Sequence, residues 1–154
     1  MTARQLLARK RTELYTVNVG ATLAEAAGRL DRHGVGALLV FDGPAPAAVS
    51  LAGVFSERDL VRLVSERGAA ALALPVRAAM SAPAQTCGPG TEVRELMARM
   101  TTRRIRHLPV VEEGRVVGVV SIGDVVKSRV LEVEGEAAVL QDALKVRWAT
   151  ALAT

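Results

Sequence analysis

Aromatic residues are scarce in this chain of 154 residues: they make up 3% of it, as one tryptophan, one tyrosine and two phenylalanines. Hydrophobic residues still account for 50% of the sequence, which is enough to bury a core. We therefore expect a core of aliphatic side chains, namely valine, leucine, isoleucine, alanine and methionine. A chain of this length suits one domain, or two small halves that share a core.

Residues that could cross-link the chain or bind a metal are equally rare. Cys87 is the single cysteine, which excludes an internal disulfide and fits a reducing cytoplasm. The two histidines, His33 and His107, are far apart in the sequence, and no cysteine–histidine cluster predicts a metal site. Nothing near Cys87 would stabilise a thiolate, so we interpret it as a small apolar residue rather than a redox sensor.

Long apolar runs are also absent from the sequence. Residues 1–10 are mixed and polar and lack the apolar stretch of a signal peptide, and no run approaches the length of a membrane span. We therefore expect a cytoplasmic protein that does not enter a membrane. The net charge of +4 is small and spread along the chain, which indicates a solvated surface rather than a nucleic-acid-binding one.

An internal repeat is the feature that predicts the architecture. Four apolar residues within 23–30 have the spacing of one helix face, and four more within 93–100 repeat that face 70 residues later. Apolar runs typical of strands, at 35–40 and 105–110, keep the same offset. The two helix faces consist of Leu23, Ala26, Ala27 and Leu30, and of Val93, Leu96, Met97 and Met100.

The offset between the two copies falls to 65 residues further on, because 53–59 repeats as 118–124. The extra residues of the first copy lie in the turn at 42–50, which contains glycine and proline. Each copy therefore predicts the order strand, helix, strand, strand, helix. Because one copy cannot cover both faces of its small sheet, we expect the two to pack together with pseudo-twofold symmetry.

The repeat also defines the expected domain boundaries. We expect a first repeat with an N-terminal helix at 1–67, a linker at 68–80, a second repeat at 81–131 and a C-terminal helical extension at 132–154.

The last helix carries apolar residues at alternating spacings of four and three, which is the pattern of a coiled-coil seam. The seam consists of Val126, Val130, Val133, Ala137, Leu140 and Leu144. We interpret it as a contact between two copies of the chain in a homodimer. The alternative is packing of this helix on its own domain, and Gly135 weakens the helix interior in either case.

The sequence Gly-apolar-apolar-Ser-x-x-Asp occurs in both copies, as Gly53–Asp59 and Gly118–Asp124. A glycine lets the backbone approach a ligand, a serine that opens a helix exposes N–H groups to a phosphate, and an aspartate can accept both hydroxyls of a ribose. The same spacing also forms a capping box, in which the acid bonds back to the helix start. Duplication leaves both interpretations open, because a repeat copies its caps too.

The two halves resemble a pair of cystathionine-beta-synthase (CBS) repeats over roughly residues 4–130, with Arg106–Val110 and Gly118–Asp124 as the closest match. The first copy departs from the family pattern at Val35–Leu39, which lacks a proline, and in its longer turn. The length and the extended last helix are similar to stand-alone bacterial members. The resemblance implies an α/β fold in which two β-α-β-β-α repeats form one disc-like module, followed by the C-terminal helix.

The resemblance further implies where a ligand would bind. In the family the motif aspartate holds a ribose and its serine faces the phosphate, which implies Asp59 with Ser56 and Asp124 with Ser121. Each cleft is built across both repeats, so the Asp59 cleft would contain strand residues of the second copy and the Asp124 cleft those of the first. The implied neighbours are Thr86, Cys87, Arg106 and His107 for Asp59, and Thr16, Val17, Gly36 and Ala37 for Asp124.

The two clefts are expected to differ in charge. Arg58, Arg106 and His107 are available to phosphate oxygens beside Asp59, and the guanidinium fork matches phosphate geometry. The corresponding positions beside Asp124 carry no charge. A base pocket is expected from Thr16, Val17, Gly36, Ala37, Thr86 and Cys87.

We therefore expect a non-catalytic sensor that binds an adenosine-containing nucleotide and then changes its shape or association. AMP, ADP, ATP, NAD and S-adenosylmethionine share the adenosine part, so the ligand stays open. No nucleophile accompanies His107, and we expect neither catalysis nor a required cofactor. The alternative is a structural dimerisation or protein-interaction module in which both Ser-x-x-Asp pairs are only helix caps.

Overall fold

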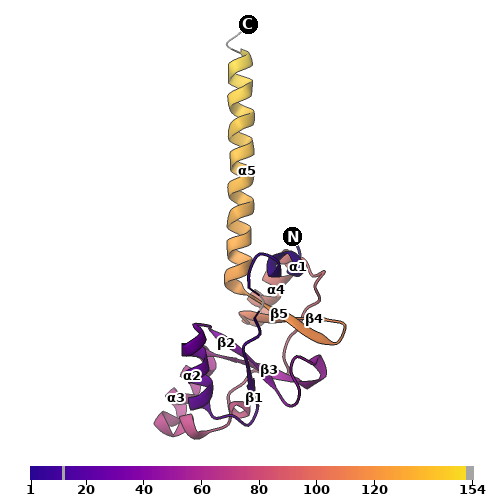
Figure 1. Ribbon diagram of the computed structural model, residues 1–154. Helices are drawn as coiled ribbons and strands as arrows, with labels where there is room; N and C mark the ends of the chain where they lie inside the picture. Colours follow the sequence, from indigo (N-terminus) through magenta and orange to yellow (C-terminus); the bar gives the residue numbers. More distant parts are fainter. Residues whose placement is uncertain (12, 152–154) are drawn as a thin grey trace.

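The computed structural model describes residues 1–11 and 13–151, with side chains up to residue 145; the last three residues of the expected C-terminal extension lie outside this range. The first repeat consists of β1 (Thr16–Asn18), α2 (Leu23–His33), β2 (Ala37–Phe41), β3 (Leu51–Ser56) and α3 (Glu57–Arg67). The second consists of α4 (Val93–Arg103), β4 (His107–Glu112), β5 (Arg115–Ser121) and α5 (Ile122–Ala151). A short helix, α1 (Ala3–Leu7), comes first (Figure 1).

The strand registers reproduce the repeat that the sequence predicts. In the first copy β1 runs parallel to β2, which is antiparallel to β3, so that Val40 lies opposite both Val17 and Gly53. In the second copy β4 is antiparallel to β5, and Val110 lies opposite both Cys87 and Gly118. A register shift follows Val40 in one copy and Val110 in the other. The α/β fold with two β-α-β-β-α repeats is therefore confirmed.

The first strand of the second repeat is shorter than its counterpart, since it is reduced to a single bridge at Cys87. In the first repeat, Val19 N donates to Phe41 O at 3.1 Å and Leu39 N donates to Tyr15 O at 2.9 Å. The counterparts of Val19 and Leu39 are Pro89 and Pro109, which have no N–H to donate. Only the two bonds of Cys87 remain, with Pro109 O at 3.0 Å and Val111 N at 2.8 Å.

Three groups of buried hydrophobic side chains, most of them aliphatic, hold the molecule together. One lies under α2 and α3 and includes Leu23 and Phe55, and a second lies under α4 and includes Leu96 and Leu108. The third joins the repeats, with Leu39 and Phe41 of β2 packed near Val116 of β5. Both sheets therefore bury one face against the other repeat.

Two segments outside the repeats pack on them. Residues 68–80 form the 3-10 helices η2 (Gly68–Ala73) and η3 (Val76–Ala78), and Ala71 and Val76 are buried in the first core. A further 3-10 helix, η1 (Ala48–Ser50), lies in the long turn of the first repeat. Helix α1 packs on the second repeat, where Ala3, Leu6 and Leu7 belong to its core.

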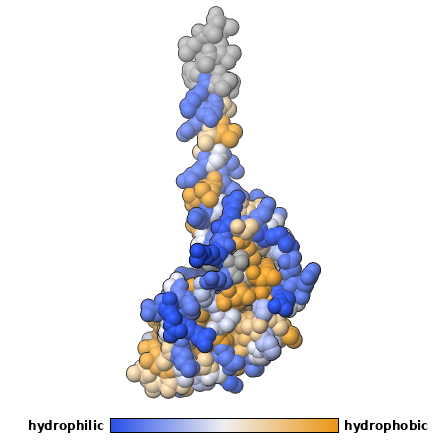
Figure 2. All heavy atoms as spheres, viewed as in Figure 1, coloured by the Kyte–Doolittle hydropathy of each residue, from blue (hydrophilic) through white to orange (hydrophobic). Residues whose placement is uncertain are grey.

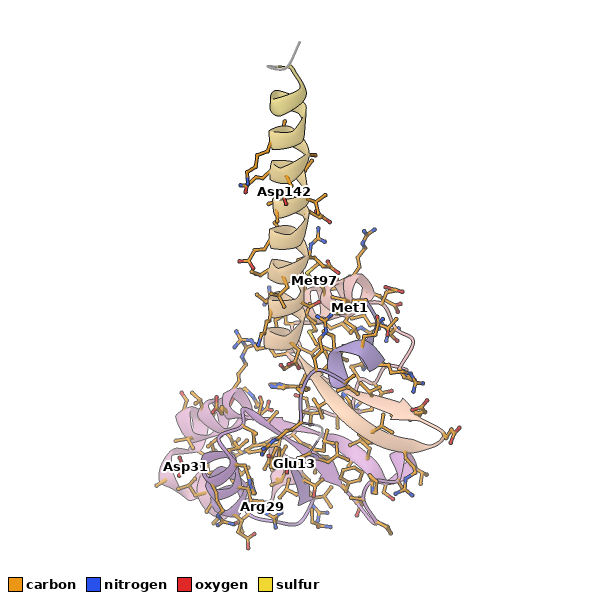
Figure 3. All side chains as sticks on the ribbon, turned by 45° about the horizontal axis from the view of Figure 1, so that its top comes forward. Met1, Glu13, Arg29, Asp31, Met97 and Asp142 are labelled. Carbon is orange, nitrogen blue, oxygen red and sulfur yellow. The ribbon has the colours of Figure 1, made fainter. Side chains whose placement is uncertain are left out.

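Helix α5 leaves the body of the molecule as a single free-standing rod (Figure 1). Only its first turns contact α1, α4 and β5, and Ser128 is its last buried residue within the described side chains. Met1 and Met97 lie beside this base, whereas Asp142 lies on the free part (Figure 3). No helix within the described residues has the length and apolar character to cross a bilayer.

The seam of α5 does not pack on its own domain. Val130, Val133, Leu140 and Leu144 are all about half exposed or more, and apolar patches alternate with polar ones along the rod (Figure 2). The alternative of intramolecular packing is therefore wrong for these residues.

Candidate functional site

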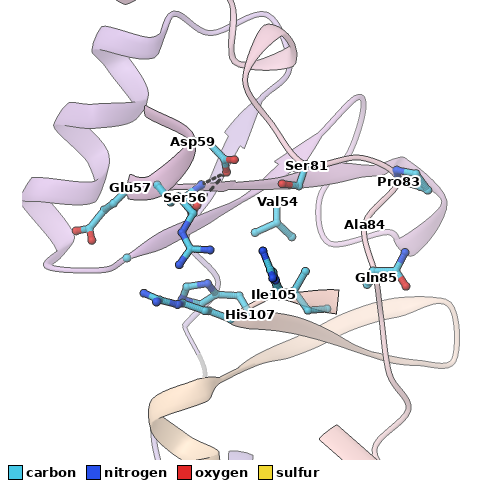
Figure 4. A pocket seen from close by; sticks show the side chains of 14 residues that line it. Val54, Ser56, Glu57, Asp59, Ser81, Pro83, Ala84, Gln85, Ile105 and His107 are labelled. Carbon is cyan, nitrogen blue, oxygen red and sulfur yellow. Dashed lines mark hydrogen bonds between the residues drawn. The ribbon is translucent and has the colours of Figure 1, made fainter. Parts of the chain in front are cut away.

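A cleft lies between the two repeats at the start of α3 (Figure 4). One wall comes from the first repeat, through Val54 and Ser56 of β3 and the first residues of α3. The opposite wall comes from the second repeat, through Ser81–Gln85 and through Ile105 and His107 at the start of β4 (Figure 4). The full lining is Gly36, Val54, Ser56, Glu57, Arg58, Asp59, Ser81, Pro83, Ala84, Gln85, Arg104, Ile105, Arg106 and His107.

Asp59 in this cleft uses one oxygen for its helix and leaves the other without a hydrogen bond. Its Oδ2 accepts from Ser56 N at 2.8 Å and from Ser56 Oγ at 2.9 Å, which closes the capping box at the start of α3. Oδ1 accepts no hydrogen bond from the described residues and has Arg62 NH2 at 4.0 Å. The cap and a ligand contact therefore use different oxygens and are compatible.

The Asp59 cleft is rich in positive charge. Arg58, Arg104 and Arg106 line it with exposed side chains, and its acidic residues are Glu57 and Asp59. Burial, followed by the charges of Lys10 and Arg106, lowers the pKa of His107 below its usual value of 6.5. The imidazole is therefore neutral at pH 7 and can either donate or accept a hydrogen bond.

Each motif glycine makes a close contact with another part of the protein. A Cβ on Gly53 would lie 2.5 Å from Ser81 O, and one on Gly118 would lie 2.7 Å from Leu7 Cδ1. The spacing reflects two close contacts, one between the repeats and one with α1.

A second cleft occupies the related position in the other half. Its lining pairs with that of the first cleft through the repeat: Val35, Gly36 and Ala37 correspond to Ile105, Arg106 and His107, and Val119 and Ser121 to Val54 and Ser56. The remaining lining residues are Lys10, Arg11, Glu13, Tyr15, Leu38, Leu39, Val54 and His107. Gly36, Val54 and His107 line both clefts, which are therefore adjacent.

Asp124 repeats the capping geometry and also has a cationic partner. Its Oδ2 accepts from Ser121 N at 2.8 Å and from Ser121 Oγ at 2.9 Å, and Lys10 Nζ lies 2.5 Å from the same oxygen. Burial raises the pKa of Asp124, but the hydrogen bonds from Lys10 and Ser121 outweigh it, so the pKa lies below 3.8. The carboxylate is therefore ionised and paired.

Four of the residues expected around the base line neither cleft. Val17 and Cys87 are buried in the two cores, because they are the paired residues of the first strands. Thr16 O accepts from Arg29 at 2.8 Å and Thr86 O accepts from Arg99 at 3.2 Å. Burial raises the pKa of the Cys87 thiol to about 11, so it stays protonated.

The segments that line the clefts instead lie directly before these strands. Tyr15 lines one cleft and Gln85, its counterpart 70 residues later, lines the other. The repeat offset pairs these positions in the sequence, and that is the signal that could have indicated them. The hydrogen bond from Arg103 to Gln85 joins residues 18 positions apart, and no repeat pattern in the sequence indicates it.

The described residues include no group of three or more His, Cys, Asp or Glu that could hold a metal ion.

Two α/β repeats with clefts between them are the architecture of a tandem CBS pair. A family model for the CBS domain matches residues 4–66 and 76–130, and the chain therefore belongs to the CBS-domain family.

Known relatives resemble both the sequence and the fold. The crystal structure of the CBS-domain containing protein ATU1752 from Agrobacterium tumefaciens is 42% identical, with a TM-score of 0.76, over 83% of this chain and 92% of that one. The CBS domain protein PAE2072 from Pyrobaculum aerophilum, complexed with AMP, is 31% identical, with a TM-score of 0.67, over 80% of this chain and 89% of that one.

The mitochondrial CBS domain-containing protein CBSX3 of Arabidopsis thaliana is 37% identical over 113 residues. This match covers 72% of the present chain but 54% of the Arabidopsis protein, so the chain spans about half the length of that relative.

Proposed function

We propose that this chain is a non-catalytic regulatory module of the cytoplasm that binds an adenosine-containing nucleotide, AMP, ADP, ATP or NAD, between its CBS repeats. Binding then changes the shape or association of the protein. The observation that carries the proposal is the Asp59 cleft, where an open carboxylate oxygen lies beside a helix start and three arginines. The AMP held by the Pyrobaculum relative supports an adenosine ligand.

The ribose of the ligand would bind Asp59. Oδ2 already accepts two hydrogen bonds from Ser56, whereas Oδ1 has capacity for two more. Because Asp59 is 9% exposed, a ribose hydroxyl that reaches it would be largely removed from water, where a charge-assisted hydrogen bond is strong.

The phosphate would bind among Arg58, Arg106 and His107, with the start of α3 as a further source of N–H groups. The arginines are exposed and come from both repeats, so an anion between them would draw the two halves together. This gives the ligand a means of changing the relative position of the repeats.

The cleft geometry gives no support to nucleotide hydrolysis. The Ser56 hydroxyl donates to Asp59, and no hydrogen bond between His107 and a hydroxyl occurs in the part of the chain that the structure describes.

Calorimetric titration of the wild type with AMP and with adenosine tests the proposal. We expect Arg106→Ala to weaken AMP binding by about one to two decades, since a charge-assisted contact contributes about 1–3 kcal/mol. Adenosine has no phosphate, so its affinity for Arg106→Ala should change little. Asp59→Ala should weaken both ligands, because they share the ribose.

Two further variants make the titration specific. Asp59→Asn keeps an oxygen for the cap of α3 and should retain more stability than Asp59→Ala. Arg94→Ala removes an exposed positive charge of α4 that lines neither cleft, and it should bind AMP like the wild type. No saturable heat with AMP, ATP, NAD or S-adenosylmethionine would refute nucleotide sensing. Binding that survives Asp59→Ala and disappears in Asp124→Ala would identify the other cleft as the site.

A second candidate function is homodimerisation through α5. The observation that favours it is the free-standing rod, whose seam residues are exposed as far as Leu144. An apolar stripe of this kind is stable in water when a second helix covers it. The two functions are compatible, because the dimer helix and the clefts use different residues.

A further inference from the structure

The exposed seam of α5 lies on the side of the helix away from its own domain. Ser128, at the base of the helix, is 3% exposed and contacts Met1. Each residue turns an α-helix by about 100°, so Ser128 lies about 160° around the axis from both Val126 and Val130. These two seam residues are 53% and 49% exposed. A second helix can therefore cover the seam from the side opposite to the domain, starting at its base.

The heptad assignment of the seam identifies the side chains that flank it. The a positions are Val130, Ala137 and Leu144, and the d positions are Val126, Val133 and Leu140. Residues at the e and g positions lie beside this apolar stripe, and their charges set the direction of the partner helix. The g positions are Arg129, Glu136 and Ala143, and the e positions are Lys127, Glu134 and Gln141.

A parallel pair of helices brings opposite charges together. In a parallel coiled coil a g residue lies beside the e residue of the partner helix that is one heptad layer further along. Arg129 therefore lies beside Glu134 of the second copy, and twofold symmetry makes this contact twice. Arg129 also donates to Glu132 of its own helix through NH1 at 2.9 Å, and its guanidinium has further N–H groups for the partner. Glu136 lies beside the uncharged Gln141.

An antiparallel pair with the same overlap of apolar residues brings like charges together. In that arrangement Val126 lies opposite Leu144, e residues face e residues, and g residues face g residues. Glu134 then lies beside Glu134 of the second copy, and Glu136 lies beside Glu136. Because juxtaposed like charges destabilise an interface, the flanking charges favour the parallel direction.

We infer that two copies of this chain associate through α5 in a parallel coiled coil, with Arg129 of each copy paired to Glu134 of the other. The inference rests on the second candidate function, homodimerisation, and adds the direction of the helices to it. Gly135 occupies the f position, on the outer face of the coil, so it does not interrupt the seam. The two CBS modules then lie at the same end of the coil, on opposite sides of it.

Disulfide cross-linking of the full chain tests the direction. In a parallel pair the two Leu140 positions share one layer, so Leu140→Cys should form a disulfide-linked dimer under mild oxidation. In the antiparallel pair they would be about 15 Å apart along the axis, beyond the reach of a disulfide. Leu140 would then face Val130, and mixing Leu140→Cys with Val130→Cys would give a mixed disulfide. The unsubstituted chain, whose Cys87 is buried, is the control and should not cross-link.

Glu134→Gln has opposite effects in the two directions and leaves the apolar seam unchanged. It removes an attraction from the parallel pair and a repulsion from the antiparallel pair. We expect it to raise the dissociation constant of the dimer, measured by sedimentation equilibrium, about threefold to fivefold, the effect of losing two exposed ion pairs. Glu136→Gln is the matched control. It faces Gln141 in the parallel pair and should leave the dissociation constant unchanged.

The outcomes separate the inference from the function on which it rests. A mixed disulfide between Leu140→Cys and Val130→Cys, or an unchanged or tighter dimer in Glu134→Gln, would overturn the inference and leave homodimerisation through α5 correct. An unsubstituted chain that sediments as a monomer at high concentration would refute homodimerisation, and the inference with it. The charge variants keep the inference testable if a cysteine in the seam weakens the dimer.

Discussion

Asp59 and Asp124 are the two residues that the sequence allowed to be interpreted either as helix caps or as ligand-binding carboxylates. Both close a capping box through Oδ2, so the capping interpretation is correct for each of them. The same geometry leaves Oδ1 of Asp59 without a hydrogen-bonded donor among the described residues, and a cap alone does not need an aspartate in a cleft with three arginines. One side chain thus stabilises a helix start and presents an acceptor to the interface of the repeats.

A second prediction at the level of single residues is that His107 makes AMP binding depend on pH. Its pKa is lowered by burial and then by the charges of Lys10 and Arg106, so the free protein holds it neutral. A bound phosphate favours the protonated imidazole and raises this pKa. AMP should therefore bind more tightly as the pH falls through the range in which His107 takes up its proton.

The control for this prediction is His107→Gln, because the phosphate of AMP also titrates near pH 6. The ratio of the dissociation constants of His107→Gln and wild type should rise as the pH falls. It could reach about tenfold, the value of one charge-assisted contact near 1.4 kcal/mol. A ratio independent of pH would show that His107 does not touch the phosphate.

At the scale of elements, the sequence predicted the order of most helices and strands. That prediction rested on the constant offset between the two copies. The strand registers agree with it, since Val40 and Val110 occupy equivalent positions in the two ladders. It did not predict that the second copy would keep only a bridge at Cys87. The cause was present in the sequence as Pro89 and Pro109, but it emerges only when their missing N–H groups are compared with the first ladder.

The residues that line the clefts were harder to predict from the sequence. The motif residues could be assigned, whereas the approach of Lys10 to Asp124 and of Ser81 to Gly53 depends on the packing of distant segments. No local pattern encodes a contact between α1 and β5, since the residues concerned are more than one hundred positions apart.

The motif glycines give a test of element packing. Gly118→Ala places a methyl group 2.7 Å from Leu7, and Gly53→Ala places one 2.5 Å from the carbonyl oxygen of Ser81. Overpacking of this kind costs about 1–3 kcal/mol, and Gly53→Ala should cost more because backbone yields less than a leucine side chain. Urea denaturation measures both.

Gly28→Ala is the matched control for these two variants. It lies within α2, is exposed, and has nothing within 4 Å of the added Cβ. Since alanine is the better helix former, this change should stabilise the protein by up to about 1 kcal/mol. If Gly53→Ala and Gly118→Ala were as harmless as Gly28→Ala, the close contacts at β3 and β5 would be incorrect.

At the scale of the whole molecule, α5 is an exposed rod with an unpaired seam. We expect Leu140→Glu to dissociate a homodimer in sedimentation velocity, because it puts a charge into the seam. Val139→Glu makes the same change one residue away, off the seam and at 70% exposure, and should leave the dimer intact. A dimer that persists in Leu140→Glu would show that the seam is not the contact.

The most direct measurement of the central claim is a crystal structure of the full chain grown with AMP. The account predicts AMP between the repeats at the start of α3, with a ribose hydroxyl on Asp59 Oδ1 and the phosphate near Arg58 and Arg106. AMP bound only in the Asp124 cleft, or an empty Asp59 cleft in a protein that binds AMP in solution, would contradict it.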